Sequence, residues 1–161
     1  MITDIKAKER LALRLCTESD LPAVLEIERG SFSTPWKEES FRNELNSPHS
    51  ILWVAEWNGC VIGYICLWFI FDEGQIVNFA IHSQYRRRGI GNYLLDSALT
   101  EAKNRHIRIL SLEVRSSNTA ALTLYKNSGF HDISIRRRYY ENGEDALVMV
   151  CELSAHLPCR S

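Results

Sequence analysis

The sequence predicts an α/β domain in which a mixed β-sheet carries helices on its faces. Residues 51–71 contain two apolar, strand-like runs joined by Asn58-Gly59, a dipeptide typical of two-residue hairpin turns. Residues 75–114 show the order strand, loop, helix, strand, and residues 130–152 add two further strand patterns. We therefore expect a central sheet of about six to seven strands flanked by about four helices.

The N-terminal part predicts one strand and two helices. Residues 11–15 alternate between apolar and other side chains, as a half-buried strand does. Residues 17–20 are typical of a helix start, and they precede apolar residues at helical spacing, namely Leu21, Val24, Leu25 and Ile27. Residues 31–36 predict a loop, and residues 37–45 a second helix.

The remaining elements follow from hydrophobic periodicity and from turn residues. Residues 89–105 carry apolar side chains at helical spacing. A shorter helix is expected at 118–128, ending at Gly129 as its C-terminal cap. The expected strands occupy 51–57, 61–71, 75–81, 107–114, 130–137 and 145–152, the last two joined around a turn at Asn142-Gly143.

Composition indicates one ordinary globular domain with no dominant electrostatic partner. The chain has 161 residues, of which 45% are hydrophobic and 24% are charged. We expect a core at about residues 11–153, with the ends 1–10 and 154–161 loosely attached. A net charge of -1 and a pI of about 6.5 provide no field that would attract nucleic acid or a membrane surface.

The cysteines and the apolar runs predict a cytoplasmic protein without disulfides or metal. There is no C-x-x-C pair and no histidine at metal-ligand spacing, so buried reduced thiols are expected for Cys16, Cys60, Cys66, Cys151 and Cys159. The first ten residues are charged and do not resemble a secretory signal. The longest apolar run, residues 64–71, is far shorter than the roughly 20 residues of a membrane-spanning helix.

The stretch 85–92, Tyr-Arg-Arg-Arg-Gly-Ile-Gly-Asn, lies between an expected strand and an expected helix. Glycines at a helix start allow a ligand to approach the backbone, and free amides with the helix dipole attract a pyrophosphate. Arginines add charge and paired donors. A dinucleotide-binding G-x-G-x-x-G fits poorly because its third glycine would fall at Leu94. A solvated loop before an ordinary helix is the alternative.

These residues carry a resemblance to a known superfamily. Arg86, Gly89 and Gly91 match the Arg/Gln-x-x-Gly-x-Gly pattern that resembles the acetyl-CoA pyrophosphate loop of the GNAT superfamily. Residues 112–118 and 120–130 resemble the signature of its RimI-type branch, the ribosomal-protein-alanine N-acetyltransferases. The similarity extends over nearly the whole domain, which makes it more specific than one short motif.

The resemblance implies a fold, an activity and a cosubstrate. Residues 1–161 would form a single N-acetyltransferase domain of GNAT fold. The enzyme would transfer the acetyl group of acetyl-CoA to a protein's N-terminal α-amino group, characteristically the N-terminal alanine of a ribosomal protein, with no metal. Two alternatives stay open: acetylation of a lysine side chain or small amine, and a CoA-binding module without catalysis.

Two residues are implied as catalytic, Glu113 as general base and Tyr125 as general acid. On the expected strand Glu113 shares a face with Arg115, so an exposed pair of these two is the alternative that the residues themselves suggest. Tyr125 falls on the expected core-facing stripe of its helix and could be a core tyrosine. Glu113 could remove the proton directly or through water.

The resemblance also implies the residues that bind acetyl-CoA. The backbone of Phe79, Ala80 and Ile81 would pair with pantetheine and polarise the thioester carbonyl. The diphosphate would contact the loop residues Arg86, Arg87, Arg88, Gly89, Ile90, Gly91 and Asn92. Asn118 would bind the cofactor's arm, or could equally be only a helix cap.

The acceptor would lie between a loop and a hairpin, which implies contacts with Phe32, Pro35, Trp36, Tyr139 and Tyr140. Tyr139 would hydrogen-bond the peptide backbone, although it could merely pack at a sheet end. Glu28 is a weaker candidate for contacting the amine, and a solvated helix position is its alternative. Arg136 to Arg138 could orient an acidic or RNA-bound acceptor; without interleaved aromatics, direct nucleic-acid binding is not expected.

Overall fold

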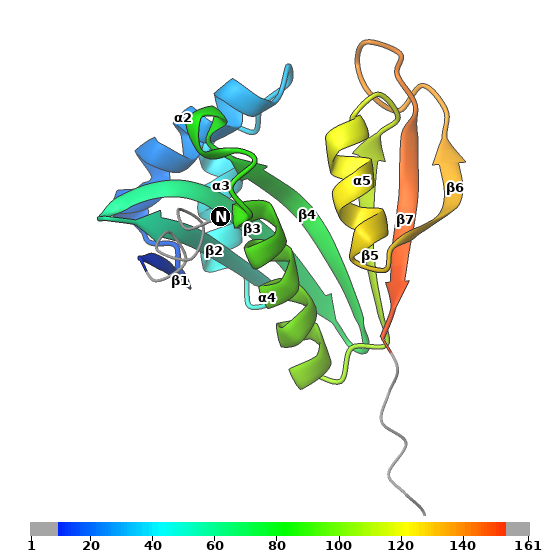
Figure 1. The fold of residues 1–161 in the computed structure, drawn as a ribbon, viewed down its shortest axis with the longest axis horizontal. Coiled ribbons are helices and arrows are strands. Elements are labelled where there is room, and N and C mark those ends of the chain that lie inside the picture. The colour runs from blue at the N-terminus through cyan, green and yellow to red at the C-terminus, as the bar shows by residue number, and fades with distance from the viewer. Residues whose placement is uncertain (1–9, 154–161) are drawn as a thin grey trace, which may run out of the picture. The chain divides into compact units, whose positions relative to one another are not determined.

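The computed structural model describes residues 10–153 (Figure 1). They form seven strands, four α-helices and two short 3-10 helices, and the strands are hydrogen-bonded in the order β1-β2-β3-β4-β5-β7-β6. The described chain divides into a first unit, residues 10–68 and 77–95, and a second unit, residues 69–76 and 96–153. The expected class, a mixed sheet with helices, is confirmed.

The first unit begins with three antiparallel strands. β1 (Leu11–Leu15) pairs with β2 (Ser50–Trp57), and β2 pairs with β3 (Cys60–Ile70). The connection between β2 and β3 is the predicted two-residue turn, in which Asn58 and Gly59 both adopt positive φ angles of 51° and 81°. The hairpin prediction is therefore confirmed.

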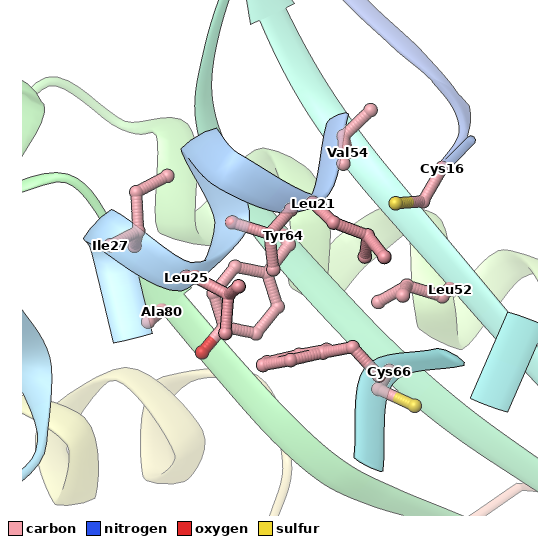
Figure 2. Packing of buried hydrophobic residues seen from close by; sticks show 11 residues of the cluster. Cys16, Leu21, Leu25, Ile27, Leu52, Val54, Tyr64, Cys66 and Ala80 are labelled. Carbon is pink, nitrogen blue, oxygen red and sulfur yellow. The ribbon is translucent and has the colours of Figure 1, made fainter. Parts of the chain in front are cut away.

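Two helices and a 3-10 turn contribute to the core of the first unit. η1 (Glu18–Asp20) leads into α2 (Leu21–Ser31), and α3 (Glu38–Asn46) follows the loop. The expected apolar face of α2 is buried in one cluster with side chains of the strands (Figure 2). Labelled there are Cys16, Leu21, Leu25, Ile27, Leu52, Val54, Tyr64, Cys66 and Ala80.

The strand β4 (Glu73–Ile81) starts two residues before its predicted position at 75. The preceding tight turn carries Phe71, which is 97% exposed and has a positive φ of 54°. Because no glycine or asparagine occupies this left-handed position, the sequence contains no turn signal there. η2 (Ser83–Tyr85) and α4 (Ile90–Asn104) follow β4.

The second unit is a small sheet with helix α5 (Thr119–Asn127) beside it (Figure 1). β5 (Ile109–Arg115) runs parallel to the first residues of β4 and antiparallel to β7 (Ala146–Glu152), which pairs with β6 (His131–Arg136). On β5 the predicted alternation is confirmed, because Leu110, Leu112 and Val114 are buried.

The cysteine prediction holds for three of the four described thiols. Cys16, Cys66 and Cys151 are buried and free, and burial raises the pKa of Cys16 and of Cys66 to about 12. Cys60 is exposed, contrary to expectation, because it directly follows the hairpin turn. Cys159 and nearly all of the two expected loose ends lie outside the described residues.

Candidate functional site

The predicted phosphate-binding loop has a defined conformation at the start of α4. Arg87 and Gly89 adopt positive φ angles of 60° and 81°. The Tyr93 amide donates to the Gly89 carbonyl at 3.1 Å, so the amides of residues 90–92 precede the intrahelical hydrogen bonds. They provide the positively polarised helix end that suits an anionic ligand.

Two arginines of this loop are bound to the first unit itself. Arg86 donates from Nε to the Ile81 carbonyl at 3.0 Å and from Nη2 to Ser31 Oγ at 3.1 Å. The guanidinium of Arg88 lies over the rings of Trp57 and Tyr85, at 5.7 and 5.4 Å from their centroids. These contacts hold the loop against the end of α2 and the β2–β3 hairpin. The sequence did not indicate these two aromatic partners of Arg88. Trp57 is distant from the loop in the chain, and Tyr85 precedes the pattern that begins at Arg86.

The end of β4 approaches β3 closely at Gly63. A Cβ built there would lie 2.7 Å from Ile81 Cδ1 and 3.2 Å from the Ala80 carbonyl oxygen. A larger residue at this position would force the Ile81 side chain to move and would press on the Ala80 carbonyl, which belongs to the segment expected to hold pantetheine. The Phe79 amide donates to Asn78 Oδ1 at 3.0 Å, so a neighbouring side chain also orients this backbone.

Glu28 is the most deeply buried charged residue of the described chain, with 1% of its surface exposed. Its Oε1 accepts the Trp36 amide at 2.9 Å, while Oε2 accepts the Tyr64 hydroxyl and Asn78 Nδ2, the latter at 3.0 Å. The interpretation of Glu28 as a solvated helix residue is therefore wrong. Its spacing three residues after Leu25 already placed it on the buried face of α2.

Glu113 lies in the second unit, on β5, with 19% of its side chain exposed. Its Oε1 is 3.1 Å from Arg136 Nε, and the Tyr139 hydroxyl also hydrogen-bonds its carboxylate, which raises the pKa of Tyr139. The alternative of a pair with Arg115 is wrong, because Arg115 pairs with Glu144 at 3.3 Å. Arg136 sits on a different strand, so strand periodicity could not reveal it.

The loop before α5 is organised by Glu144. Its Oε1 accepts the Ser117 amide at 2.9 Å, and hydrogen bonds led by the Ser117 contact lower the pKa of Glu144 to about 2. Asn118 follows as the N-cap of α5, accepting the Ala121 amide at 3.2 Å. The cap interpretation of Asn118 is confirmed, and its contact with the cofactor stays a prediction.

Three tyrosines of the second unit were predicted to belong to the site, namely Tyr125, Tyr139 and Tyr140. Tyr125 is 7% exposed and packs at 5.7 Å from the Phe130 ring, so its place on the core-facing stripe is confirmed. Burial raises the pKa of Tyr125, which keeps the hydroxyl protonated at neutral pH. Tyr139 and Tyr140 pack edge to face at 5.1 Å, and Arg115 lies 3.8 Å from the Tyr140 ring centroid.

Two classes of feature are missing from residues 10–153. They contain no group of three or more His, Cys, Asp or Glu side chains that could hold a metal ion. None of their helices combines the length and the apolar character needed to cross a membrane.

The strands, the loop and the helix described above match a known family over most of the domain. The sequence profile described as the acetyltransferase (GNAT) family matches residues 21–130. The chain belongs to the GNAT family of acetyltransferases. It is accordingly an N-acetyltransferase, as the resemblance of its loop and of residues 112–130 implied.

Individual relatives narrow the similarity within the GNAT family. A Bacillus subtilis (strain 168) protein named as a candidate ribosomal protein bS18-alanine N-acetyltransferase is 42% identical over 88% of this chain and 95% of its own length. The Escherichia coli (strain K12) ribosomal protein bS18-alanine N-acetyltransferase is 34% identical over 84% and 93%. The crystal structure of the Escherichia coli ribosomal-protein-S18-alanine N-acetyltransferase superposes with a TM-score of 0.84, at 32% identity, covering 90% of this chain and 95% of that one.

Proposed function

We propose that this N-acetyltransferase acetylates the N-terminal α-amino group of a protein, and that its acceptor is the N-terminal alanine of ribosomal protein bS18. The observation that carries the proposal is the full-length similarity to proteins named for this reaction, which covers 93% to 95% of those relatives. With a ribosomal protein as the acceptor, we expect the reaction to take place in the cytoplasm.

We infer that acetyl-CoA is the acetyl donor, and the loop and β4 residues fit it. Acetyl-CoA supplies the acetyl group already activated as a thioester. The amides of Ile90, Gly91 and Asn92 point from the start of α4, and Gly89 opens the loop in front of them. The backbone of Phe79 to Ile81 would pair with pantetheine, and Asn118 would bind the cofactor's arm.

Glu113 is proposed as the general base that takes a proton from the acceptor amine. An α-amino group has a pKa of about 8 and lysine one of about 10.4, so deprotonation at pH 7 costs roughly 1.4 kcal/mol for an N-terminus and over about 4 kcal/mol for lysine. A carboxylate that acts directly or through water is adequate for the smaller cost, and the contacts with Arg136 and Tyr139 orient it. This difference favours an N-terminus over a lysine as acceptor.

Tyr125 is proposed to stabilise the departing thiolate of CoA. Full proton transfer from a tyrosine to a thiolate is uphill by roughly 2 kcal/mol with ordinary pKa values. Burial raises the pKa of Tyr125 and makes complete transfer still less favourable. We therefore assign Tyr125 the donation of a hydrogen bond to the sulfur as negative charge develops there.

The acceptor peptide is proposed to contact two segments, the loop residues Phe32, Pro35 and Trp36 and the tyrosines Tyr139 and Tyr140. Among the three arginines at 136–138, Arg136 forms an ion pair with Glu113. We therefore assign Arg136 the role of positioning the proposed base. Arg137 and Arg138 are both exposed and are proposed as the cations that meet an acidic acceptor. The Arg138 amide donates to Asp145 Oδ1 at 2.9 Å, which holds the backbone at this position.

The deciding experiment measures acetyl-CoA-dependent mass gain on short peptides that begin with Ala, Ser or Met. Matched peptides carry a blocked N-terminus and a free lysine. We expect acetylation of free N-termini, strongest for the Ala peptide with the bS18 sequence. Acetylation of lysine instead would overturn the proposed acceptor, and CoA binding without any mass gain would favour a non-catalytic module.

A further inference from the structure

Glu28 connects three elements of the first unit through its carboxylate. It extends from α2 and receives the Trp36 amide from the loop that precedes α3. It also receives the Tyr64 hydroxyl from β3 and the Asn78 amide from β4. All these contacts come from donors, which matches the hydrogen-bonding capacity of an ionised carboxylate.

The contact with Asn78 extends to the backbone of β4. While its Nδ2 donates to Glu28 at 3.0 Å, its Oδ1 accepts the Phe79 amide, also at 3.0 Å. The orientation of the Asn78 side chain is therefore set from both ends. Glu28 thus joins the Trp36 amide and the Phe79 amide through one intervening side chain.

Aromatic rings form a second connection beside the polar one. The Trp36 ring lies 5.3 Å from that of Phe41, which meets the Tyr64 ring edge to face at 5.5 Å. Phe41 and Tyr64 are both 0% exposed, and Tyr64 lies in the cluster drawn in Figure 2. Burial and the negative charge of Glu28 raise the pKa of Tyr64, so its hydroxyl remains a donor to that carboxylate.

We propose that Glu28 is a positioning residue that fixes the loop 32–36 relative to β4 and thereby sets how tightly the acceptor binds. The proposal rests on the proposed function, since it takes this loop as part of the acceptor surface. A carboxylate removed from water is costly unless its hydrogen bonds are satisfied. Here those bonds orient the two backbone segments on which acceptor and acetyl group are expected to lie.

The test uses Glu28→Ala and Glu28→Gln, with Glu26→Ala and Glu26→Gln as matched controls on the same helix. Glu26 has a side chain that is 76% exposed, so its replacement leaves the buried contacts intact. Alanine removes both acceptor oxygens of Glu28. Glutamine keeps the shape of the side chain but retains only one acceptor oxygen. It can therefore accept either the Trp36 amide or the donors of Tyr64 and Asn78, but not both.

The first readout is backbone amide hydrogen exchange at Trp36 and Phe79, which requires no activity. We expect about tenfold faster exchange at both amides in Glu28→Ala and at only one of them in Glu28→Gln. Both controls should exchange like the wild type. Unchanged exchange in Glu28→Ala would overturn the positioning role, whatever the acceptor is.

The second readout is steady-state kinetics with the acceptor that the wild type uses. Glu28→Ala should raise the KM for acceptor about tenfold and the KM for acetyl-CoA by a smaller factor, because Glu28 binds the Trp36 amide directly but reaches Phe79 only through Asn78. Glu28→Gln, which preserves the buried volume and should therefore fold even if the alanine variant does not, should show a smaller rise. Equal rises in both KM values, or none, would overturn the proposal. A wild type that acetylates lysine instead refutes the proposed function but leaves this comparison decisive.

Discussion

Glu113 and Tyr125 have different surroundings, and these agree with the different roles proposed for the two residues in acetyl transfer. Glu113 is partly exposed and bound by Arg136 and Tyr139. Tyr125 is buried beside Phe130 and stays protonated. An accessible carboxylate can receive a proton, whereas a buried hydroxyl can stabilise charge on sulfur in a site that excludes water.

Replacing Glu113 with glutamine tests the base. Glutamine keeps the side chain's shape but cannot take up a proton, so we expect kcat on an N-terminal Ala peptide to fall about 10²- to 10⁴-fold. CoA affinity measured by calorimetry should stay unchanged. Glu101→Gln, which alters only the ion pair between Glu101 of α4 and Arg105 just after that helix, is the control. Retained turnover in Glu113→Gln would remove Glu113 from the mechanism.

Replacing Tyr125 with phenylalanine tests the hydrogen bond to sulfur. The ring packing against Phe130 is preserved, so the melting temperature should change little. Loss of the donor should lower kcat by about tenfold to a hundredfold, with unchanged KM for the peptide. A kcat equal to that of the wild type would leave Tyr125 as a core residue only.

At the scale of elements, the turn that leads into α4 favours glycine at position 89 because of its backbone conformation, and not because a side chain would lack room there. Gly89 has a φ of 81°, and a Cβ there would meet no atom within 4 Å. The left-handed region costs a residue with a side chain about 1–2 kcal/mol. We expect relief of this strain to change the direction of the amides at 90–92, which follow Gly89 directly.

We therefore expect Gly89→Ala to weaken CoA binding by about tenfold, with a fall of a few degrees in the melting temperature. Calorimetry with CoA and thermal melting measure the two effects. Gly30→Ala is the matched control, because Gly30 lies in α2 without a positive φ and an added Cβ would meet no atom within 4 Å. That variant should be neutral or slightly more stable. Equal CoA affinity in both variants would contradict a role for the Gly89 conformation.

At the scale of the whole molecule, we expect an ion pair that joins β1 to η1 to contribute to the pH dependence of stability in acid. Arg14 contacts Asp20 at 2.7 Å, and Asp20 also accepts the Thr17 amide at 2.8 Å. Chiefly through the Arg14 contact, the pKa of Asp20 falls from 3.8 to about 2. A depressed carboxyl pKa contributes stability above the unfolded value, and this contribution is lost as pH falls from about 4 to about 2.

Asp20→Asn should accordingly be less stable than the wild type at pH 7. The difference in the free energy of unfolding should shrink as the pH is lowered from about 4 to about 2. Denaturant titrations at several pH values give this comparison. A difference that stays constant with pH would show that the asparagine acts through packing or capping and not through charge.

Local patterns account for most of the fold and for the position of the loop. The Asn58-Gly59 turn, the α2 face and the alternation on β5 each follow from residues close together in the chain, where helix and strand geometry fixes the direction of side chains. The glycines of residues 85–92 likewise reveal a helix start. The turn at Phe71 was not predicted, because a phenylalanine in the sequence does not indicate a positive φ angle.

Contacts between distant residues required the folded chain. Arg136 as the partner of Glu113, and the connection of Trp36 through Glu28 and Asn78 to β4, join residues on different elements. Periodicity shows which way a side chain points but not which element will lie opposite it. Hydrogen bonds and ion pairs act only over a few ångströms, so the partners of the charged residues emerge when strand order and helix packing bring those elements together.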